Sequence, residues 1–262
     1  MSVDVREVVQ IAKEAGQAIL QLYGKEGISY EKEDKSLVTD ADFASQSVIA
    51  DRLRKYNYAV LSEEEKDSKA RLPQEYAWIV DPLDGTNDFL ANTGEFTVMM
   101  GLARAGKPVL GVVHQPATGT TYFAEKGEGA FVEDATGTRQ IQVSLEGELD
   151  KARFLVSKTH FTEDIRLFLE KHRISNVIRM GSSGLKLCKI AEGQAEAHIT
   201  FTNRTFEWDV CAADIILTEA GGRVTDTRGK NFIYNKEDPR NSYGVVAGNP
   251  VFHAQLLELV QQ

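Results

Sequence analysis

The stretch Trp78–Phe89, WIVDPLDGTNDF, joins a short apolar run to two aspartates, Asp81 and Asp84. Gly85 and Thr86 follow directly. Asp, Pro and Gly are common turn formers, so the segment could merely reverse the chain. The alternative is that the two carboxylates hold a ligand, because the ends of central strands are where α/β sheets tend to bind ligands.

The composition is that of a globular protein and excludes several classes of function. Of the 262 residues, 42% are hydrophobic and 26% charged, and the net charge is −9. That acidic balance argues against a nucleic-acid-binding surface, which needs clustered Lys and Arg. No apolar run approaches the roughly 20 residues of a membrane helix. The first residues, MSVDVREVVQ, lack the pattern of a secretory signal, so we expect a cytoplasmic protein.

The remaining chain reads as a mixed α+β part followed by an alternating α/β part. Apolar residues at helical spacing predict one helix from Val5 to Leu20 and another over Ala41–Tyr56, with Phe43 turned inward. Further strands are expected at 77–81, 96–104, 108–115, 154–157, 176–180 and 195–199, and further helices at 161–172, 184–193 and 208–220. We place the boundary near Ser144–Lys151 and divide the chain into residues 1–147 and 148–262.

Acidic residues gather beside apolar stretches at four places. These are LVTDAD (37–42), LSEEE (61–65), DPLDGT (81–86) and EWDV (207–210). Carboxylates brought together raise each other's pKa, and hard divalent cations with oxygen ligands relieve that repulsion. Asp209, at the expected start of a helix, could be a further ligand or simply an N-cap. The residues alone therefore predict a magnesium site without naming a substrate.

Taken in order, these blocks resemble the inositol monophosphatase superfamily of lithium-sensitive, magnesium-dependent phosphatases. WIVDPLDGTNDF is similar to its signature, as are SEE (62–64) and WDVCAADIILTEAGGRVTD (208–226). The resemblance runs over nearly the full length. It implies a layered α-β-α-β-α sandwich combining α+β and α/β parts, in which residues 1–147 carry most metal ligands and 148–262 carry substrate contacts. A homodimer is a further expectation, because members are often dimeric.

The resemblance also implies two magnesium ions and a weaker third, with lithium as an inhibitor. The expected ligands are Glu63, Asp81, the Leu83 carbonyl, Asp84 and Asp209. Asp42 matches the acid associated with the third ion and with orienting Thr86. Asp42, Glu63 and Thr86 are therefore the expected catalytic residues, Glu63 and Thr86 positioning a water for in-line attack on phosphorus. In such a scheme one ion lowers the pKa of a water while the other neutralises the leaving oxygen.

Within the superfamily, three segments resemble the CysQ-type 3'(2'),5'-bisphosphate nucleotidases: SKTH (157–160), GEFTV (94–98) and GSSGLKLCKIAEGQAE (181–196). The expected substrate contacts are Gly85, Thr86, Ser157, Lys158, His160, Gly181, Ser182, Ser183 and Lys186. Two positions depart from that branch. Asn87-Asp88 stands where Lys-Glu is usual, and Lys158 where Arg is typical.

The expected reaction is hydrolysis of the 3'-phosphate of adenosine 3',5'-bisphosphate to AMP and phosphate. An inositol-1-monophosphatase or a broader sugar-phosphate phosphatase stays open, although Thr202 falls where that branch has the glutamate that grips inositol hydroxyls. A non-catalytic phosphate or nucleotide sensor is a third reading, which the intact metal-ligand pattern opposes. Arg204 could supply positive charge for a second phosphate, and His160 could equally be a surface residue. The helix opened by GSSG could receive a phosphate at its N–H groups or be a simple cap.

Overall fold

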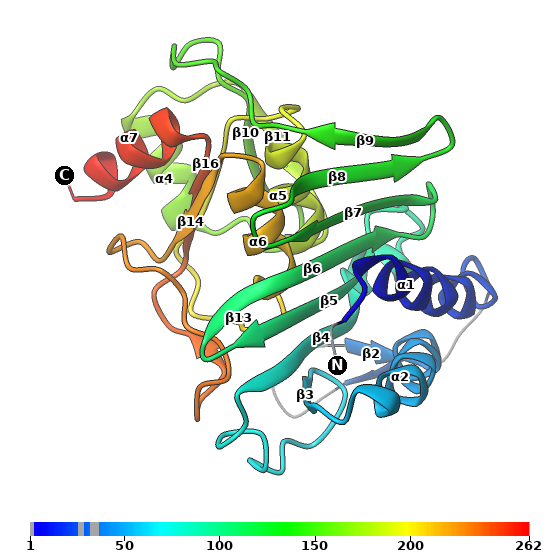
Figure 1. The fold of residues 1–262 in the computed structure, drawn as a ribbon. Helices are drawn as coiled ribbons and strands as arrows, with labels where there is room; N and C mark the ends of the chain where they lie inside the picture. Colours follow the sequence, from blue (N-terminus) through cyan, green and yellow to red (C-terminus); the bar gives the residue numbers. More distant parts are fainter. Residues whose placement is uncertain (1–2, 26–28, 32–36, 262) are drawn as a thin grey trace.

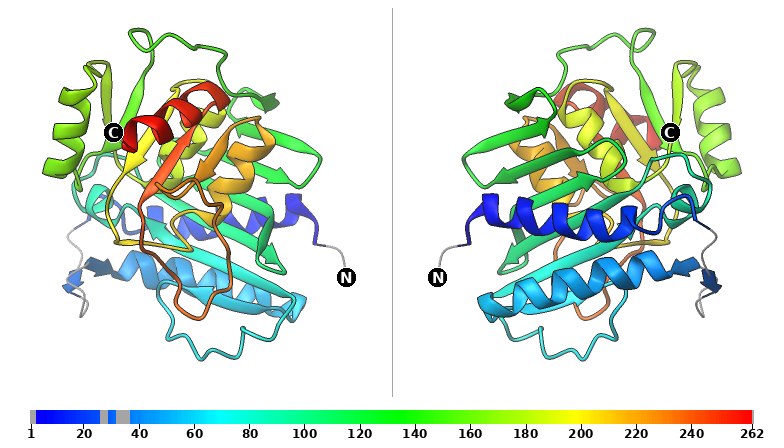
Figure 2. Two further views of the ribbon diagram at one scale, coloured as in Figure 1. Left: turned by 90° about the vertical axis from the view of Figure 1, so that its left-hand side faces the viewer. Right: turned by 90° about the vertical axis from the view of Figure 1, so that its right-hand side faces the viewer.

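The computed structural model describes residues 3–25, 29–31 and 37–261, whose helices and strands stack in five layers, α-β-α-β-α (Figures 1 and 2). The layered sandwich predicted from the sequence is confirmed. No helix in the described ranges has the length and apolar character needed to cross a bilayer. The metal-ligand candidates come from strands and turns at the edges of these layers.

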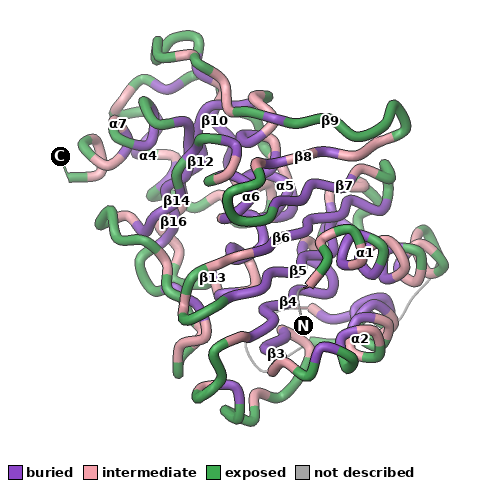
Figure 3. The backbone as a smooth tube through the Cα atoms, viewed as in Figure 1, coloured by how far each residue is buried: buried purple, intermediate pink, exposed green. Residues whose placement is uncertain are grey.

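The first β layer is a seven-stranded sheet in the order β3-β4-β5-β6-β7-β8-β9. Its strands are β3 Ala59–Ser62, β4 Tyr76–Asp84, β5 Thr97–Arg104, β6 Lys107–Gln115, β7 Thr120–Glu125, β8 Gly129–Asp134 and β9 Gly137–Ile141. Only β3 and β4 pair in parallel, and the others form an antiparallel meander. Strands β4 to β6 are buried over most of their length, whereas β9 is an exposed edge (Figure 3).

Helices α1 (Val5–Leu20) and α2 (Asp40–Leu53) cover the outer face of this sheet (Figure 1). The sequence-based expectation for α2 is wrong in two respects. The helix ends at Leu53, with a 3-10 turn over Arg54–Tyr56, and Phe43 is 47% exposed. The inward face instead presents polar side chains such as Ser45, whose Oγ donates to the Pro82 carbonyl at 2.7 Å. Helix α2 thus braces the aspartate-bearing end of β4 rather than only burying apolar surface.

The second β layer is a five-stranded sheet in the order β11-β10-β12-β16-β14. Its strands are β10 Phe154–Ser157, β11 Val177–Met180, β12 Ala197–Thr200, β14 Arg223–Thr225 and β16 Val245–Gly248. Alternate side chains face opposite layers, as a strand requires. Phe154 and Val156 pack with the outer helices α4 (Glu163–Lys171) and α7 (Pro250–Val260), while Leu155 packs on the middle layer.

The middle layer consists of α5 (Ser183–Ala191) and α6 (Cys211–Glu219), which pack between the two sheets. Helix α6 lies directly on β6, because a Cβ at Gly111 would come within 2.2 Å of the Ala212 carbonyl oxygen. The chain crosses between the sheets from Ile141 to Phe154, and the division expected at 147/148 falls in this connection. That division stays a prediction, since the shared middle layer joins both parts in one core.

Short elements complete the fold around the site. They are the helix α3 Thr86–Leu90 and the two-stranded pairs β1 Ser29–Glu31 with β2 Leu37–Thr39 and β13 Thr205–Phe206 with β15 Arg240–Asn241.

Candidate active site

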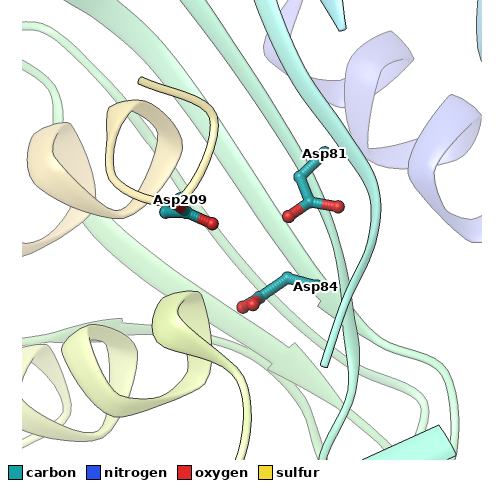
Figure 4. A group of neighbouring side chains, drawn as sticks. All are labelled: Asp81, Asp84 and Asp209. Atoms are coloured by element: carbon teal, nitrogen blue, oxygen red, sulfur yellow. The ribbon is translucent and has the colours of Figure 1, made fainter. Parts of the chain in front are cut away.

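Strand β4 presents two aspartates on one side because it contains a bulge. In a regular strand, Asp81 and Asp84 would point to opposite faces, since successive side chains alternate. Here Asp81 pairs with Met99 and Asp84 with Thr97, so three steps along β4 match two along β5. The extra residue restores the phase and turns both carboxylates toward the middle layer (Figure 4).

Asp209 approaches the same place from the turn before α6 (Figure 4). The helix expected over 208–220 begins only at Cys211, with Val210 as its N-cap, so the N-cap alternative for Asp209 is wrong. Instead, Asp209 Oδ2 accepts a hydrogen bond from the backbone N–H of Phe206 at 2.5 Å. This bond closes a turn ahead of the helix and leaves the other carboxylate oxygen directed at β4.

One carboxylate oxygen from each of Asp81, Asp84 and Asp209 lies within 4.8 Å of the others. Burial, followed by the charges of Glu63, Asp84 and Asp209, raises the pKa of Asp81 well above its ordinary value, and burial likewise raises the pKa of Asp209. Such a cluster is electrostatically unfavourable by itself. Its all-oxygen donor set fits a hard divalent cation such as magnesium.

Glu63 and Leu83, the other expected ligands, line the same cavity as the three aspartates. Glu63 follows β3 directly, and its backbone N–H donates to the Val80 carbonyl at 3.2 Å, which ties it to β4. The backbone N–H of Leu83 donates to Asp81 Oδ1 at 3.0 Å. The expected metal ligands are thus brought together around one end of β4.

The turn after β4 places Thr86 beside Asp42. Gly85 permits this turn, because its φ is 95° and a Cβ there would lie 2.9 Å from the Glu95 carbonyl oxygen. Thr86 Oγ1 lies 3.3 Å from Asp42 Oδ1, and the second oxygen of Asp42 accepts from the N–H and hydroxyl of Thr39 at 2.7 Å each. Asp42 therefore caps α2 and orients Thr86 at the same time.

A cavity of about 670 Å³ adjoins the aspartates. Most of the expected substrate contacts line it: Gly85, Thr86, Ser157, His160, Ser182, Ser183 and Lys186. Two of them, Lys158 and Gly181, do not. The expected contacts therefore divide into seven residues that line the cavity and two, Lys158 and Gly181, that do not.

The first turn of α5 contacts Asp84 in this structure. Ser182 Oγ accepts from the Leu185 N–H at 3.0 Å and donates to Asp84 Oδ2 at 2.5 Å, and the Gly184 N–H donates to the same oxygen at 2.9 Å. Lys186 is buried and donates to the Ser182 carbonyl at 2.7 Å, and burial lowers the pKa of its ammonium group. The helix start thereby fixes one carboxylate of the cluster.

The chain matches the family model described as the inositol monophosphatase family over residues 3–262. It belongs to the inositol monophosphatase family. The curated 3'(2'),5'-bisphosphate nucleotidase CysQ of Salmonella typhimurium is 38% identical over 244 residues, which cover 91% of this chain and 96% of that protein. The crystal structure of CysQ from Bacteroides thetaiotaomicron, 30% identical, has a TM-score of 0.79 and covers 93% of this chain and 96% of its own. The extragenic suppressor protein SuhB from Bartonella henselae, 28% identical, has a TM-score of 0.83 and covers 98% of both chains. The resemblance to this superfamily and to its CysQ-type branch is confirmed.

Lys158, one of the two departures from the bisphosphate nucleotidase pattern, contacts two carboxylates. Lys158 Nζ lies 2.6 Å from Glu95 Oε2 and 3.6 Å from Asp88 Oδ1. Glu95 Oε2 also accepts from the Gly181 N–H at 2.7 Å, and Asp88 is buried. Asp88, which lines the cavity, and Lys158, which does not, therefore belong to one network of contacts through Glu95.

Four cavity residues of this family member were not predicted as site residues from the sequence: His198, Phe206, Trp208 and Arg240. Arg240 reaches the cavity through the pairing of β15 with β13, and its guanidinium lies 5.6 Å from the Phe206 ring centre. The rings of Phe206 and Trp208 stack at 4.8 Å. His198 contacts the Leu155 carbonyl through Nδ1 at 2.9 Å, and burial lowers its pKa to about 3, so it is neutral. A two-residue strand such as β15 carries no periodic signal from which Arg240 could be predicted.

Proposed function

We propose that this chain is a magnesium-dependent phosphatase that removes the 3'-phosphate of adenosine 3',5'-bisphosphate, giving AMP and inorganic phosphate. The observation that carries the proposal is the charge pattern of the cavity. It combines the carboxylates of Asp81, Asp84 and Asp209 with two arginines, Arg204 and Arg240. Within the described ranges, neither guanidinium pairs with a carboxylate. A bisphosphate matches both halves of this pattern. One phosphate would bind at the metal held by the carboxylates, and the other would bind the arginines, since Arg binds phosphate through two parallel hydrogen bonds.

Asp81, Asp84 and Asp209 would hold magnesium, with Glu63 and the Leu83 carbonyl as further ligands. Bound metal supplies charge neutralisation at the phosphoryl and leaving oxygens and a lowered pKa for the attacking water. Asp42 keeps the Thr86 hydroxyl oriented, because that hydroxyl donates to Asp42. Thr86 Oγ1 would then accept a hydrogen bond from the water, and Glu63 would accept a second one. The water oxygen would thereby be aimed at phosphorus, opposite the 3' oxygen. As the new O–P bond forms, the bond from phosphorus to the 3' oxygen breaks, and a proton released by the water ends on the 3' oxygen to give AMP and phosphate.

The relatives support the nucleotide as substrate, because the Salmonella relative's name specifies a 3'(2'),5'-bisphosphate nucleotidase. The aromatic stack of Phe206 and Trp208 in the cavity adds apolar surface suited to a planar base. The same proposal includes two magnesium ions with a weaker third, inhibition by lithium, and a homodimeric state.

The test is phosphate release with magnesium from adenosine 3',5'-bisphosphate, AMP, inositol 1-phosphate and fructose 1,6-bisphosphate. We expect the first to have the highest kcat/KM and lithium to inhibit it. A preference for inositol 1-phosphate would replace the nucleotide by a polyol substrate. Binding of the bisphosphate without turnover of any compound would instead favour a sensor.

A further inference from the structure

A chain of partly buried polar contacts joins the segment after Glu63 to the turn that carries Asp209. Its members are Arg71, Glu207 and Asn235, none of which lines the cavity. Arg71 is 1% exposed and Glu207 is fully buried. Burying charged groups away from the substrate is costly, so their partners indicate what they do.

Glu207 fixes the Asp209 turn through both its backbone and its side chain. Its carbonyl accepts from the Cys211 N–H at 2.9 Å, which starts α6, and its own N–H donates to the Pro239 carbonyl at 2.9 Å. Its carboxylate accepts from the backbone N–H groups of Asn235 at 2.5 Å and Lys236 at 2.9 Å. The turn two residues before Asp209 is therefore bound to the 235–239 loop.

Asn235 carries the connection onward to Arg71. Its Oδ1 accepts from Arg71 Nη1 at 2.9 Å and its Nδ2 donates to the Arg71 carbonyl at 3.0 Å. Arg71 Nη1 also donates to the Lys236 carbonyl at 2.7 Å. Asp67 receives the rest of the guanidinium, with Nη2 to Oδ2 at 2.7 Å. Asp67 and Arg71 both lie in the connection that leads from Glu63 to β4.

We propose that Glu207, Asn235 and Arg71 are positioning residues that set the separation between Glu63 and Asp209 and so tune magnesium affinity. Glu63 and Asp209 come from segments far apart in the sequence, and these contacts tie the two segments together outside the cavity. Residues that orient metal ligands without contacting the metal strongly affect metal affinity. The inference rests on the metal centre of the proposed function.

Asn235→Gly is the most selective probe. Asn235 has φ of 62°, a left-handed conformation that glycine adopts without strain, so the backbone N–H to Glu207 is kept while both side-chain bonds to Arg71 are lost. Asn57→Gly is a matched control, because Asn57 has φ of 54° and ends the 3-10 turn after α2. Arg71→Lys is a second variant that retains the buried charge and removes the guanidinium fork.

The experiment titrates magnesium alone into metal-free protein by calorimetry and measures Tm with and without saturating magnesium. For Asn235→Gly and Arg71→Lys we expect the magnesium Kd to rise on the order of 10-fold, with a smaller magnesium-induced rise in Tm. The magnesium needed for half-maximal phosphate release should rise in parallel while kcat recovers at saturation. Asn57→Gly should match the wild type in all three.

A variant that lowers Tm equally with and without magnesium, at unchanged Kd, would overturn the inference and leave a purely structural role. If Asn235→Gly does not fold, Arg71→Lys decides by the same criterion. Wild-type protein that binds no magnesium would overturn the metal centre itself, which separates failure of the proposed function from failure of this inference.

Discussion

Replacing Asp84 by Asn should separate stability from activity. In the metal-free protein, Asp84 contributes a negative charge within 4.8 Å of carboxylate oxygens on Asp81 and Asp209. Two unit charges at that distance repel by about 3.5 kcal/mol at an effective dielectric of ~20. Burial and the neighbouring carboxylates raise the pKa values of Asp81 and Asp209, which lowers their average negative charge and leaves only part of that repulsion.

We therefore expect Asp84→Asn to stabilise the metal-free protein by about 1 kcal/mol, a rise in Tm of roughly 2–4 °C. The amide oxygen can still accept the hydrogen bonds from Ser182 and Gly184. The same change should lower kcat by at least about 100-fold, since a neutral amide is a poor magnesium ligand.

Calorimetric melting without metal and phosphate release with magnesium measure the two effects. Asp164→Asn is the control, because Asp164 is an exposed carboxylate in the first turn of α4 and stands outside the cluster. That variant should gain no stability. A metal-free Asp84→Asn protein no more stable than wild type, or one with near-normal kcat, would refute the reasoning.

Three further predictions test other parts of the structure. Replacing Arg204 and Arg240 by Ala should raise KM for the bisphosphate at least about 10-fold and leave kcat/KM for a monophosphate unchanged; equal losses on both substrates would contradict a second-phosphate role. Gly181→Ala should lower the free energy of unfolding, measured in urea, by about 1–3 kcal/mol, because the new Cβ would lie 2.2 Å from Asp88 Oδ2. Gly147→Ala is the control and should cause no such loss, because the nearest atom to its Cβ, Val251 Cγ1, lies at 3.7 Å. Burial lowers the pKa of His114 to about 4, so the unfolded chain takes up that proton first as pH falls. As pH falls from ~6.5 to ~4, the free energy of unfolding of the wild type should decrease by about 3 kcal/mol more than that of His114→Gln. Urea unfolding at several pH values measures this difference, and the same pH dependence in both proteins would exclude this role.

The sequence predicted the aspartate cluster because its signal is local. Asp81 and Asp84 stand three residues apart after an apolar run, and Pro82 and Gly85 constrain the backbone between and after them. Family resemblance then supplied Asp209, which no periodicity could have placed beside them. Its exact local structure, a turn held by the Phe206 N–H, was not predictable, because it depends on one side-chain contact.

The misplaced Phe43 shows why hydrophobic periodicity failed on α2. That helix turns Asp42, Ser45 and Gln46 inward, where they contact Thr86, the Pro82 carbonyl and Ser62. A helix face that supports an active site is buried and polar at once, so a pattern built on apolar spacing selects the wrong side. Arg240 was missed for a different reason, since only the pairing of β13 with β15 brings it to the cavity.

The bulge in β4 also makes part of the site independent of side-chain identity. Two aspartates separated by one residue in a regular strand would also share a face. The carbonyls between them would then accept hydrogen bonds from the neighbouring strands. The bulge leaves the carbonyls of Pro82 and Leu83 free to accept from Ser45 and Thr86. Substitution at Leu83, which is 2% exposed, changes core packing but cannot remove its main-chain oxygen. An insertion or deletion would displace that oxygen, so this segment should tolerate changes of residue far better than changes of length.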